Sequence, residues 1–220
     1  RFVFFMAHSF SDWITLHSEL EIEHAYAKTG QDGEILFEQL QMDFDFCESM
    51  GLRMGRLLAP LGIINKTHEP ATFNGVERPG FAKYLIPSTW SLDGVGLYGK
   101  MTEQFSYEIY LTNGLNGAGF TGKNGLREGR LHERPSWNQN AVTGRVDYYL
   151  GGMTRIGWSF YSSGVNNGNK GVNPGIDEDV KTTIQSVDAQ TSWKGIDFKV
   201  VTATVNIENV EKLNEFLQTQ

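Results

Sequence analysis

Acidic side chains recur at every second position in two segments of the chain, and this spacing determines what chemistry they could perform. Glu19, Glu21 and Glu23 form one series, and Asp43 and Asp45 form another. Alternate residues of a β-strand share a face, so each series would form a row of carboxylates on one side of a strand. On a wet surface such rows would attract cations and repel anions. Alternatively, they neutralise arginines on the same surface, because unpaired like charges on adjacent strands are costly.

Further charged residues fall in later alternating segments, and some of them are arginines that could neutralise the acidic rows. We predict that all of these side chains share one polar wall. The candidates are Glu19, Glu21, Glu23, Asp43, Asp45, Arg53, Arg56, Glu108, Arg145 and Arg155.

The pair His68 and Glu69 could in principle bind a metal or act as a general base. A zinc site needs three or four ligands, and no second histidine lies at motif spacing. We therefore predict no metal site, no catalytic residue and no cofactor.

The elements that would position these charges are β-strands in which apolar and polar residues alternate. Residues 14–26 are the clearest case, with Leu16, Leu20 and Ile22 on the parity opposite to the glutamates. The period of two predicts about ten strands along the chain. They are expected at residues 2–8, 14–26, 36–46, 52–59, 95–99, 105–112, 142–150, 155–161, 186–193 and 196–200.

The connections between these strands alternate strictly between short and long. Short ones are expected at residues 9–12, 48–51, 100–102, 151–152 and 194–195. Long ones are expected at residues 28–33, 60–93, 113–140, 162–180 and from 206 onward. In an up-and-down meander all short turns then lie at one end, an asymmetry typical of outer-membrane β-barrels. The patterns therefore favour an all-β transmembrane antiparallel up-and-down β-barrel.

Composition narrows the possible partners. The net charge is −7 and no cluster of lysine and arginine stands out, which argues against nucleic acid. No apolar run reaches the roughly 20 residues of a membrane-spanning helix, but barrel strands need only about 9–11 residues each. The long connections are bracketed by strands of one kind, so we expect a single domain over residues 1–220.

The segment at 52–96 carries the most specific motifs of the chain. It contains His68-Glu69-Pro70, Gly75-Val76-Glu77-Arg78, Ile86-Pro87-Ser88-Thr89-Trp90 and Gly94-Val95-Gly96. These resemble motifs of bacterial outer-membrane porins of the phosphate-selective porin O/P type. The resemblance implies a sixteen-stranded barrel in the bacterial outer membrane that is usually trimeric. It does not imply the substrate, because no lysine cluster like that of the phosphate-selective members can be placed here.

The long segment at 64–90 is expected to fold inward and narrow a pore. Its lining candidates are His68, Glu69, Glu77, Arg78 and Lys83. The alternative is that it forms an outer cap or a contact between subunits.

Together these features predict a non-enzymatic channel for passive diffusion of small hydrophilic solutes or ions, surrounded by membrane lipids and assembled as a homotrimer. The first strand would start on the long-loop side and the last strand would end there. Bacterial barrels normally begin and end on the short-turn side, so we expect an internal piece of the barrel, incomplete at both ends. Two alternatives are a soluble all-β binding module and an outer-membrane barrel enzyme.

Overall fold

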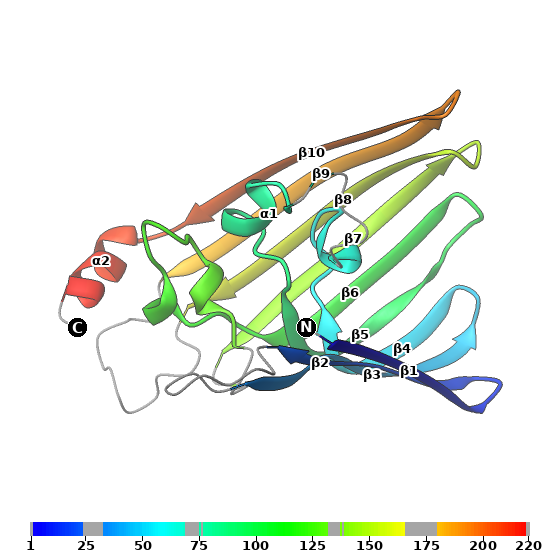
Figure 1. Ribbon diagram of the computed structural model, residues 1–220, viewed down its shortest axis with the longest axis horizontal. Helices are drawn as coiled ribbons and strands as arrows, with labels where there is room; N and C mark the ends of the chain where they lie inside the picture. Colours follow the sequence, from blue (N-terminus) through cyan, green and yellow to red (C-terminus); the bar gives the residue numbers. More distant parts are fainter. Residues whose placement is uncertain are drawn as a thin grey trace.

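The structure is a computed structural model that describes residues 2–23, 33–68, 75, 77–131, 137, 139–165 and 180–218. Its main feature is one sheet of ten antiparallel strands that follow one another in sequence order (Figure 1). The strands are β1 (Phe2–Ser11), β2 (Ile14–Glu23), β3 (Glu34–Cys47), β4 (Met50–Leu58), β5 (Ser91–Lys100), β6 (Phe105–Asn113), β7 (Asn140–Leu150), β8 (Thr154–Gly164), β9 (Lys181–Trp193) and β10 (Ile196–Ile207). The predicted all-β, up-and-down antiparallel fold is therefore confirmed.

The connections alternate in length as predicted. The turns after β1, β3, β5, β7 and β9 are short, and all of them lie at one end of the sheet (Figure 1). The turn between β9 and β10 shows how the chain reverses direction within two residues. Lys194 and Gly195 in this turn have φ angles of 49° and 81°. Two successive positive φ angles define the tight hairpin turn that matches the twist of antiparallel strands.

Short helices lie in the long connections and after β10. They are η1 (Asn65–Thr67), α1 (Phe81–Tyr84), η3 (Gly117–Gly119), η4 (Arg127–Gly129) and α2 (Val210–Gln218). The sequence predicted a loop from residue 206 onward, so α2 is a correction; its Leu213 packs into the apolar core. None of the described helices is both long enough and apolar enough to span a membrane.

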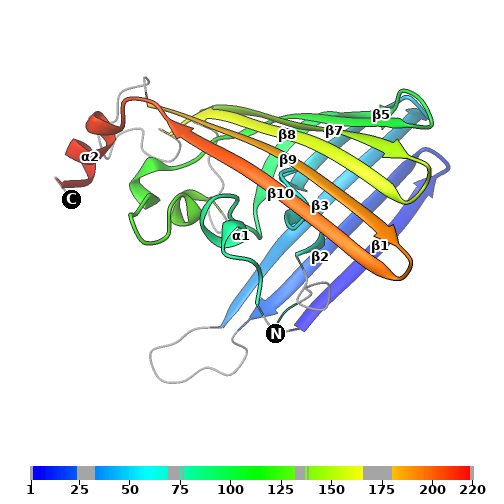
Figure 2. The same cartoon turned by 90° about the horizontal axis from the view of Figure 1, so that it is seen from above.

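The sheet curves into an open trough, with η1 and α1 on its inner side (Figures 1 and 2). Among the described residues, β1 pairs only with β2 and β10 only with β9, so the sheet is not closed. The closed barrel that the sequence predicts is thus not formed by these ten strands alone.

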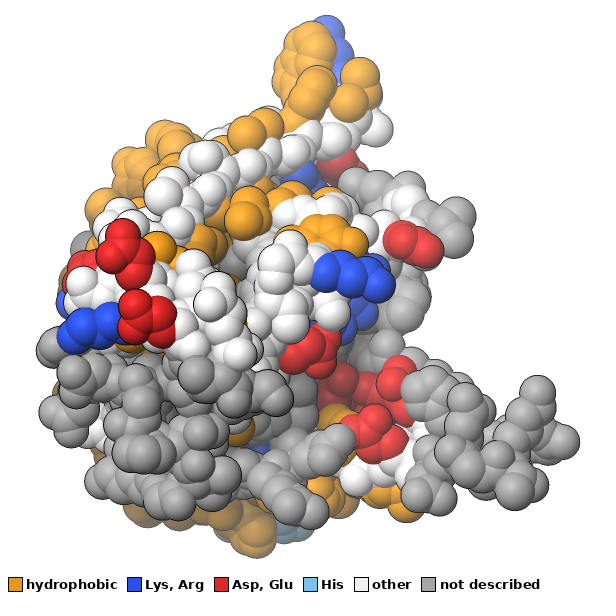
Figure 3. Space-filling model, turned by 90° about the vertical axis from the view of Figure 1, so that its left-hand side faces the viewer, with side chains coloured by type: hydrophobic (Ala, Val, Ile, Leu, Met, Phe, Trp, Pro, Cys, Tyr) orange, Lys and Arg blue, Asp and Glu red, His pale blue; other side chains and the backbone are white. Residues whose placement is uncertain are grey.

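The two faces of the sheet differ in the way that the alternation predicts. Ile109, Trp158 and Phe198 on the convex face are 43%, 43% and 51% exposed. Glu19 and Arg145 on the concave face are 3% and 2% exposed. Viewed from the end with the long loops, apolar side chains follow the outer margin and charged side chains gather in the hollow (Figure 3). Apolar residues also line up across neighbouring strands of the convex face, in the register Met42, Met54, Val95, Leu111 and Val142.

One bulge breaks the alternation in β3. Glu19 pairs with Gln39 while Leu20 pairs with Phe37, so Glu38 is the extra residue. A bulge shifts the parity of the residues beyond it, and it turns Glu38 into the concave side, where it is 8% exposed. Strict alternation over the predicted strand at 36–46 places Leu36 on the same face as Leu40, but the bulge puts the two side chains on opposite faces.

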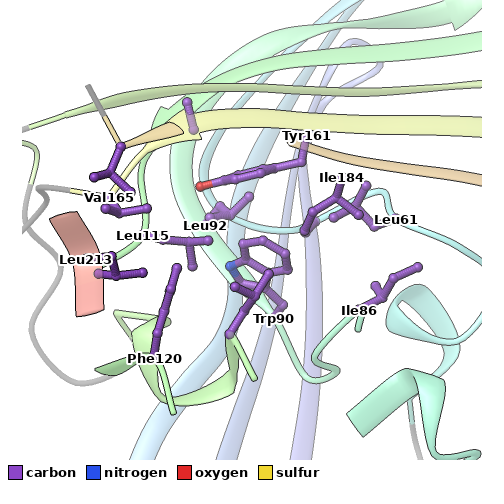
Figure 4. Packing of buried hydrophobic residues seen from close by; sticks show 14 residues of the cluster. Leu61, Ile86, Trp90, Leu92, Leu115, Phe120, Tyr161, Val165, Ile184 and Leu213 are labelled. Atoms are coloured by element: carbon purple, nitrogen blue, oxygen red, sulfur yellow. The ribbon is translucent and has the colours of Figure 1, made fainter. Parts of the chain in front are cut away.

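The apolar core fills the concave side at the long-loop end (Figure 4). The rings of Trp90 and Tyr161 lie 4.8 Å apart, and both side chains are fully buried. Leu115 and Phe120 reach this cluster from the loop between β6 and β7. The described parts of the connections after β4 and β6 are therefore packed onto the sheet.

Trp90 should be far more important for stability than an exposed tryptophan of the same sheet. Trp90→Ala should lower the free energy of unfolding by about 3–5 kcal/mol, because it leaves a cavity in the core. Trp158→Ala, on the convex face, is the control and should cost much less. Denaturant unfolding of both variants provides the comparison, and equal losses would show that Trp90 does not anchor the core.

Candidate functional site

The concave wall is built around Arg145 on β7. Its guanidinium donates to Asp147 Oδ1 at 2.7 Å and to Asp188 Oδ2 on β9 at 2.7 Å. Arg155 on β8 lies 3.5 Å from Asp147 and 3.6 Å from Asp188. A Cβ built on Gly157 would lie 1.9 Å from Arg145 Nη2, so glycine is required beneath this guanidinium. Two arginines and two carboxylates thus form one paired cluster.

A second set of pairs crosses from β3 to β6. Arg53 donates to both oxygens of Asp43, with both distances at 2.7 Å, a bidentate geometry that is the strongest form of this pair. Arg53 also donates to the Tyr110 hydroxyl at 3.1 Å, and that hydroxyl donates to Glu108 Oε2 at 2.7 Å. Lys66, from the loop after β4, donates to the other oxygen of Glu108. Arg53 therefore neutralises Asp43, as the alternative interpretation of the acidic rows predicts, and Lys66 neutralises Glu108.

The remaining wall candidates differ in position. Glu19 and Glu21 are buried, Glu23 is half-buried, and Asp45 is exposed and accepts a hydrogen bond from Tyr98.

Arg56 was predicted to lie on the polar wall, and the structure shows that it does not. It stands opposite Leu40 and Asp93 in the register and donates to Asp93 at 3.1 Å. Because it lies three residues from Arg53, it faces the convex side and does not belong to the wall.

Residues 59–68, here called the inward segment, fold onto the concave face and contact the wall at several strands. The Gly62 amide donates to Ser159 Oγ at 3.1 Å, and Arg145 donates to the Gly62 carbonyl at 2.9 Å. Asn65 is 1% exposed and holds the base of the segment together. Its amide donates to the carbonyls of Ala59 and Trp90 at 2.8 and 2.9 Å, and its carbonyl accepts from the Trp90 amide at 2.7 Å.

His68 is a buried titratable group at the end of this segment, with 2% of its surface exposed. Its Nδ1 lies 2.8 Å from the Asn65 carbonyl, and its Nε2 lies 2.7 Å from Glu38 and 3.7 Å from Glu19. Burial alone would lower the pKa of His68, but the hydrogen bond with Glu38 and the charge of that carboxylate outweigh it and raise the pKa above its ordinary value. Glu38 was not among the predicted residues, because the bulge that turns it inward has no signal in the alternation.

The other candidates of the long segment at 64–90 are less central. Glu77 and Lys83 are exposed, and Arg78 is half-buried and donates to the carbonyl of Ser88. Glu69 lies outside the described residues.

A hollow of about 540 Å³ lies between the inward segment and the wall, toward the short-turn end. Its basic lining residues outnumber the acidic ones. The basic residues are Arg53, Lys66, Lys100, Arg145, Arg155 and Lys199, and the acidic ones are Glu48, Glu108 and Asp147. The hollow is thus lined by side chains of both charges, and the basic ones outnumber the acidic ones.

Comparison with known proteins gives one informative match. No protein-family model matches the chain. It is 37% identical over 171 residues to an uncharacterized protein of Aquifex aeolicus (strain VF5), a match that covers 76% of this chain and 39% of that protein. The chain therefore spans about two fifths of its relative, and the relative's description carries no function.

Removal of the Arg145 charge should destabilise the wall strongly. Arg145→Met should lower the free energy of unfolding by about 3–5 kcal/mol, because it leaves the buried Asp188 and Asp147 without their main cation. Arg155→Met is the matched control, since that side chain is more exposed and lies farther from both carboxylates. Urea unfolding measures both, and an Arg145 loss no larger than the Arg155 loss would contradict the central role of Arg145.

Proposed function

We propose that this chain is part of an outer-membrane channel of the porin type, through which small hydrophilic solutes or ions diffuse passively. The proposal rests on how apolar and charged side chains are divided between the two faces of the sheet, which is the reverse of a water-soluble protein. The exposed convex face is apolar and the sheltered concave face is charged. A monomer in water rarely exposes contiguous apolar surface of this extent, whereas a barrel wall in lipid requires it.

Aromatic residues near the short turns support a membrane position. Trp13 lies in one short turn, Phe46 and Trp193 lie beside two others, and the three are 47%, 53% and 59% exposed. Phe105 and Tyr148, beside two further turns, lie with ring centroids 4.7 Å apart. Aromatic side chains concentrate at this level in outer-membrane barrels, because they suit the boundary between lipid and water.

Closure of the channel requires strands beyond the ten described here. Among the described residues the outer edges of β1 and β10 pair with no strand, and more than half of the Aquifex relative lies outside the match. We propose one barrel domain with sixteen strands, assembled as a homotrimer in the bacterial outer membrane, as the porin resemblance implies. In this arrangement the inward segment narrows the pore and the protein performs no chemistry.

A soluble all-β binding module is the main alternative, with a barrel enzyme as a less favoured one. A soluble module would need a second layer over the convex face, and among the described residues no second sheet covers it. An enzyme would need a nucleophile or a general base that is open to substrate, whereas the ring of His68 is buried.

The channel proposal predicts stepwise current. The full-length protein, purified in detergent and added to a planar lipid bilayer, should produce discrete conductance steps in potassium chloride. Heat-denatured protein at the same detergent concentration is the control. A protein that stays monodisperse without detergent and gives no steps would favour the soluble module.

The excess of basic residues in the hollow predicts that this end of the pore prefers anions over cations. Inverting two of them, with Lys100→Glu and Lys199→Glu together, should shift the zero-current potential across a salt gradient toward cation preference. The matched control, Lys100→Arg with Lys199→Arg, keeps the charge and should leave the potential unchanged. Because charges act over about 8–10 Å at physiological salt, the shift should shrink as ionic strength rises. An unchanged potential in the inverted variant would show that the hollow does not select ions.

A further inference from the structure

Three buried side chains from three separate elements converge at one point of the concave side. Glu19 lies on β2, Glu38 forms the bulge of β3, and His68 follows η1 on the inward segment. One potential ligand atom from each lies within 4.8 Å of the other two. All three side chains are at most 10% exposed.

The orientation of the imidazole identifies the atom that faces the carboxylates. Nδ1 lies 2.8 Å from the Asn65 carbonyl, which can only accept, so Nδ1 carries a hydrogen. Nε2 is therefore directed at Glu38 and Glu19, and in a neutral ring it presents a lone pair to them. Histidine ligands of metal ions are held in the same way, with one ring nitrogen bound to a carbonyl or carboxylate and the other bound to the metal.

We propose that Glu19, Glu38 and His68 form a binding site for one divalent transition metal ion, of which Zn²⁺ is the representative. One imidazole nitrogen and two carboxylates are a donor set that zinc accepts, whereas calcium and magnesium prefer oxygen alone. The ion would offset both carboxylates and leave the imidazole neutral.

The distances suit such an ion. Ligand bonds of about 2.0–2.1 Å in tetrahedral geometry place neighbouring ligand atoms about 3.3–3.4 Å apart. The two separations from Nε2 are 2.7 Å to Glu38 and 3.7 Å to Glu19, one shorter and one longer than this value. All three ligand atoms lie within 4.8 Å of one another, so side-chain rotations would bring them into the first coordination shell of one ion, with a fourth position left for water.

The site would attach the inward segment to a second part of the wall. Arg145 and Ser159 already hold Gly62 at β7 and β8, while His68 reaches β2 and β3. A metal ion here would cross-link the segment to the opposite side of the trough. Sequence spacing could not reveal this site, because its two carboxylates are 49 and 30 residues away from His68 along the chain.

The competing arrangement is a metal-free ion pair between a protonated His68 and Glu38, supported by the charge of Arg130, which also acts on Glu38. The metal site predicts that each chain takes up one metal ion, and the ion pair predicts that it takes up none. This difference can be measured in detergent solution, so the result does not depend on whether the protein conducts ions.

The test uses the whole protein, stripped with a chelator and titrated with Co²⁺. We expect one Co²⁺ per chain, visible absorption bands of a nitrogen- and oxygen-ligated tetrahedral ion, and displacement by Zn²⁺. His68→Asn retains a donor toward the Asn65 carbonyl but removes the Nε2 ligand, and Glu38→Gln removes a charged ligand. Each should weaken Zn²⁺ binding in calorimetry by about 100-fold or more, since even partners of metal ligands contribute 10–100-fold.

His17→Asn is the matched control. His17 lies on the same strand as Glu19, 3.9 Å from Asp43, with its side chain 43% exposed. This variant should bind Zn²⁺ like the unmodified protein. Absence of stoichiometric Co²⁺ or Zn²⁺ uptake by the unmodified protein would overturn the proposal whether or not the variants fold. Uptake that survives both His68→Asn and Glu38→Gln in folded protein would overturn it as well.

Discussion

The contact between Arg145 and its two carboxylates is the interaction on which the concave side depends. A guanidinium that is 2% exposed must have its charge and its donors satisfied, and Asp147 and Asp188 satisfy them from two strands. The same side chain donates to the Gly62 carbonyl, so the wall and the inward segment share one set of hydrogen bonds. Loss of the charge would therefore disturb the strand pairing and the position of the segment together.

The two ends of the trough are held by different forces. At the long-loop end, Trp90, Tyr161 and Leu115 exclude water by apolar packing. Toward the short-turn end the concave side holds paired charges around an open hollow. Apolar packing thus holds the described parts of the loops after β4 and β6 against the sheet, while the hollow is lined by charged side chains of both signs. The concave face of one sheet thus carries both a packed apolar core and a charged hollow.

Much of the fold could be predicted from the sequence, because alternation reports directly which side of a strand each residue occupies. The strands, the order of short and long connections and the apolar convex face follow from that rule. The rule also separates Arg53 from Arg56, which are three residues apart, although both were expected on the wall. The bulge at Glu38 could not be predicted, because an extra residue in a strand leaves the composition unchanged and alters only the register. Partners such as Asp188, and the meeting of His68 with Glu19, depend on contacts between distant segments.

The number of strands has a geometric consequence. In a closed barrel whose neighbours are all antiparallel, directions alternate around the ring, and this is possible only for an even total. Ten strands already form an even set, with β1 and β10 running in opposite directions. Any segment that closes the ring must therefore add an even number of strands, and six would satisfy this in a barrel of sixteen. An odd addition would make the two strands that meet at the seam parallel.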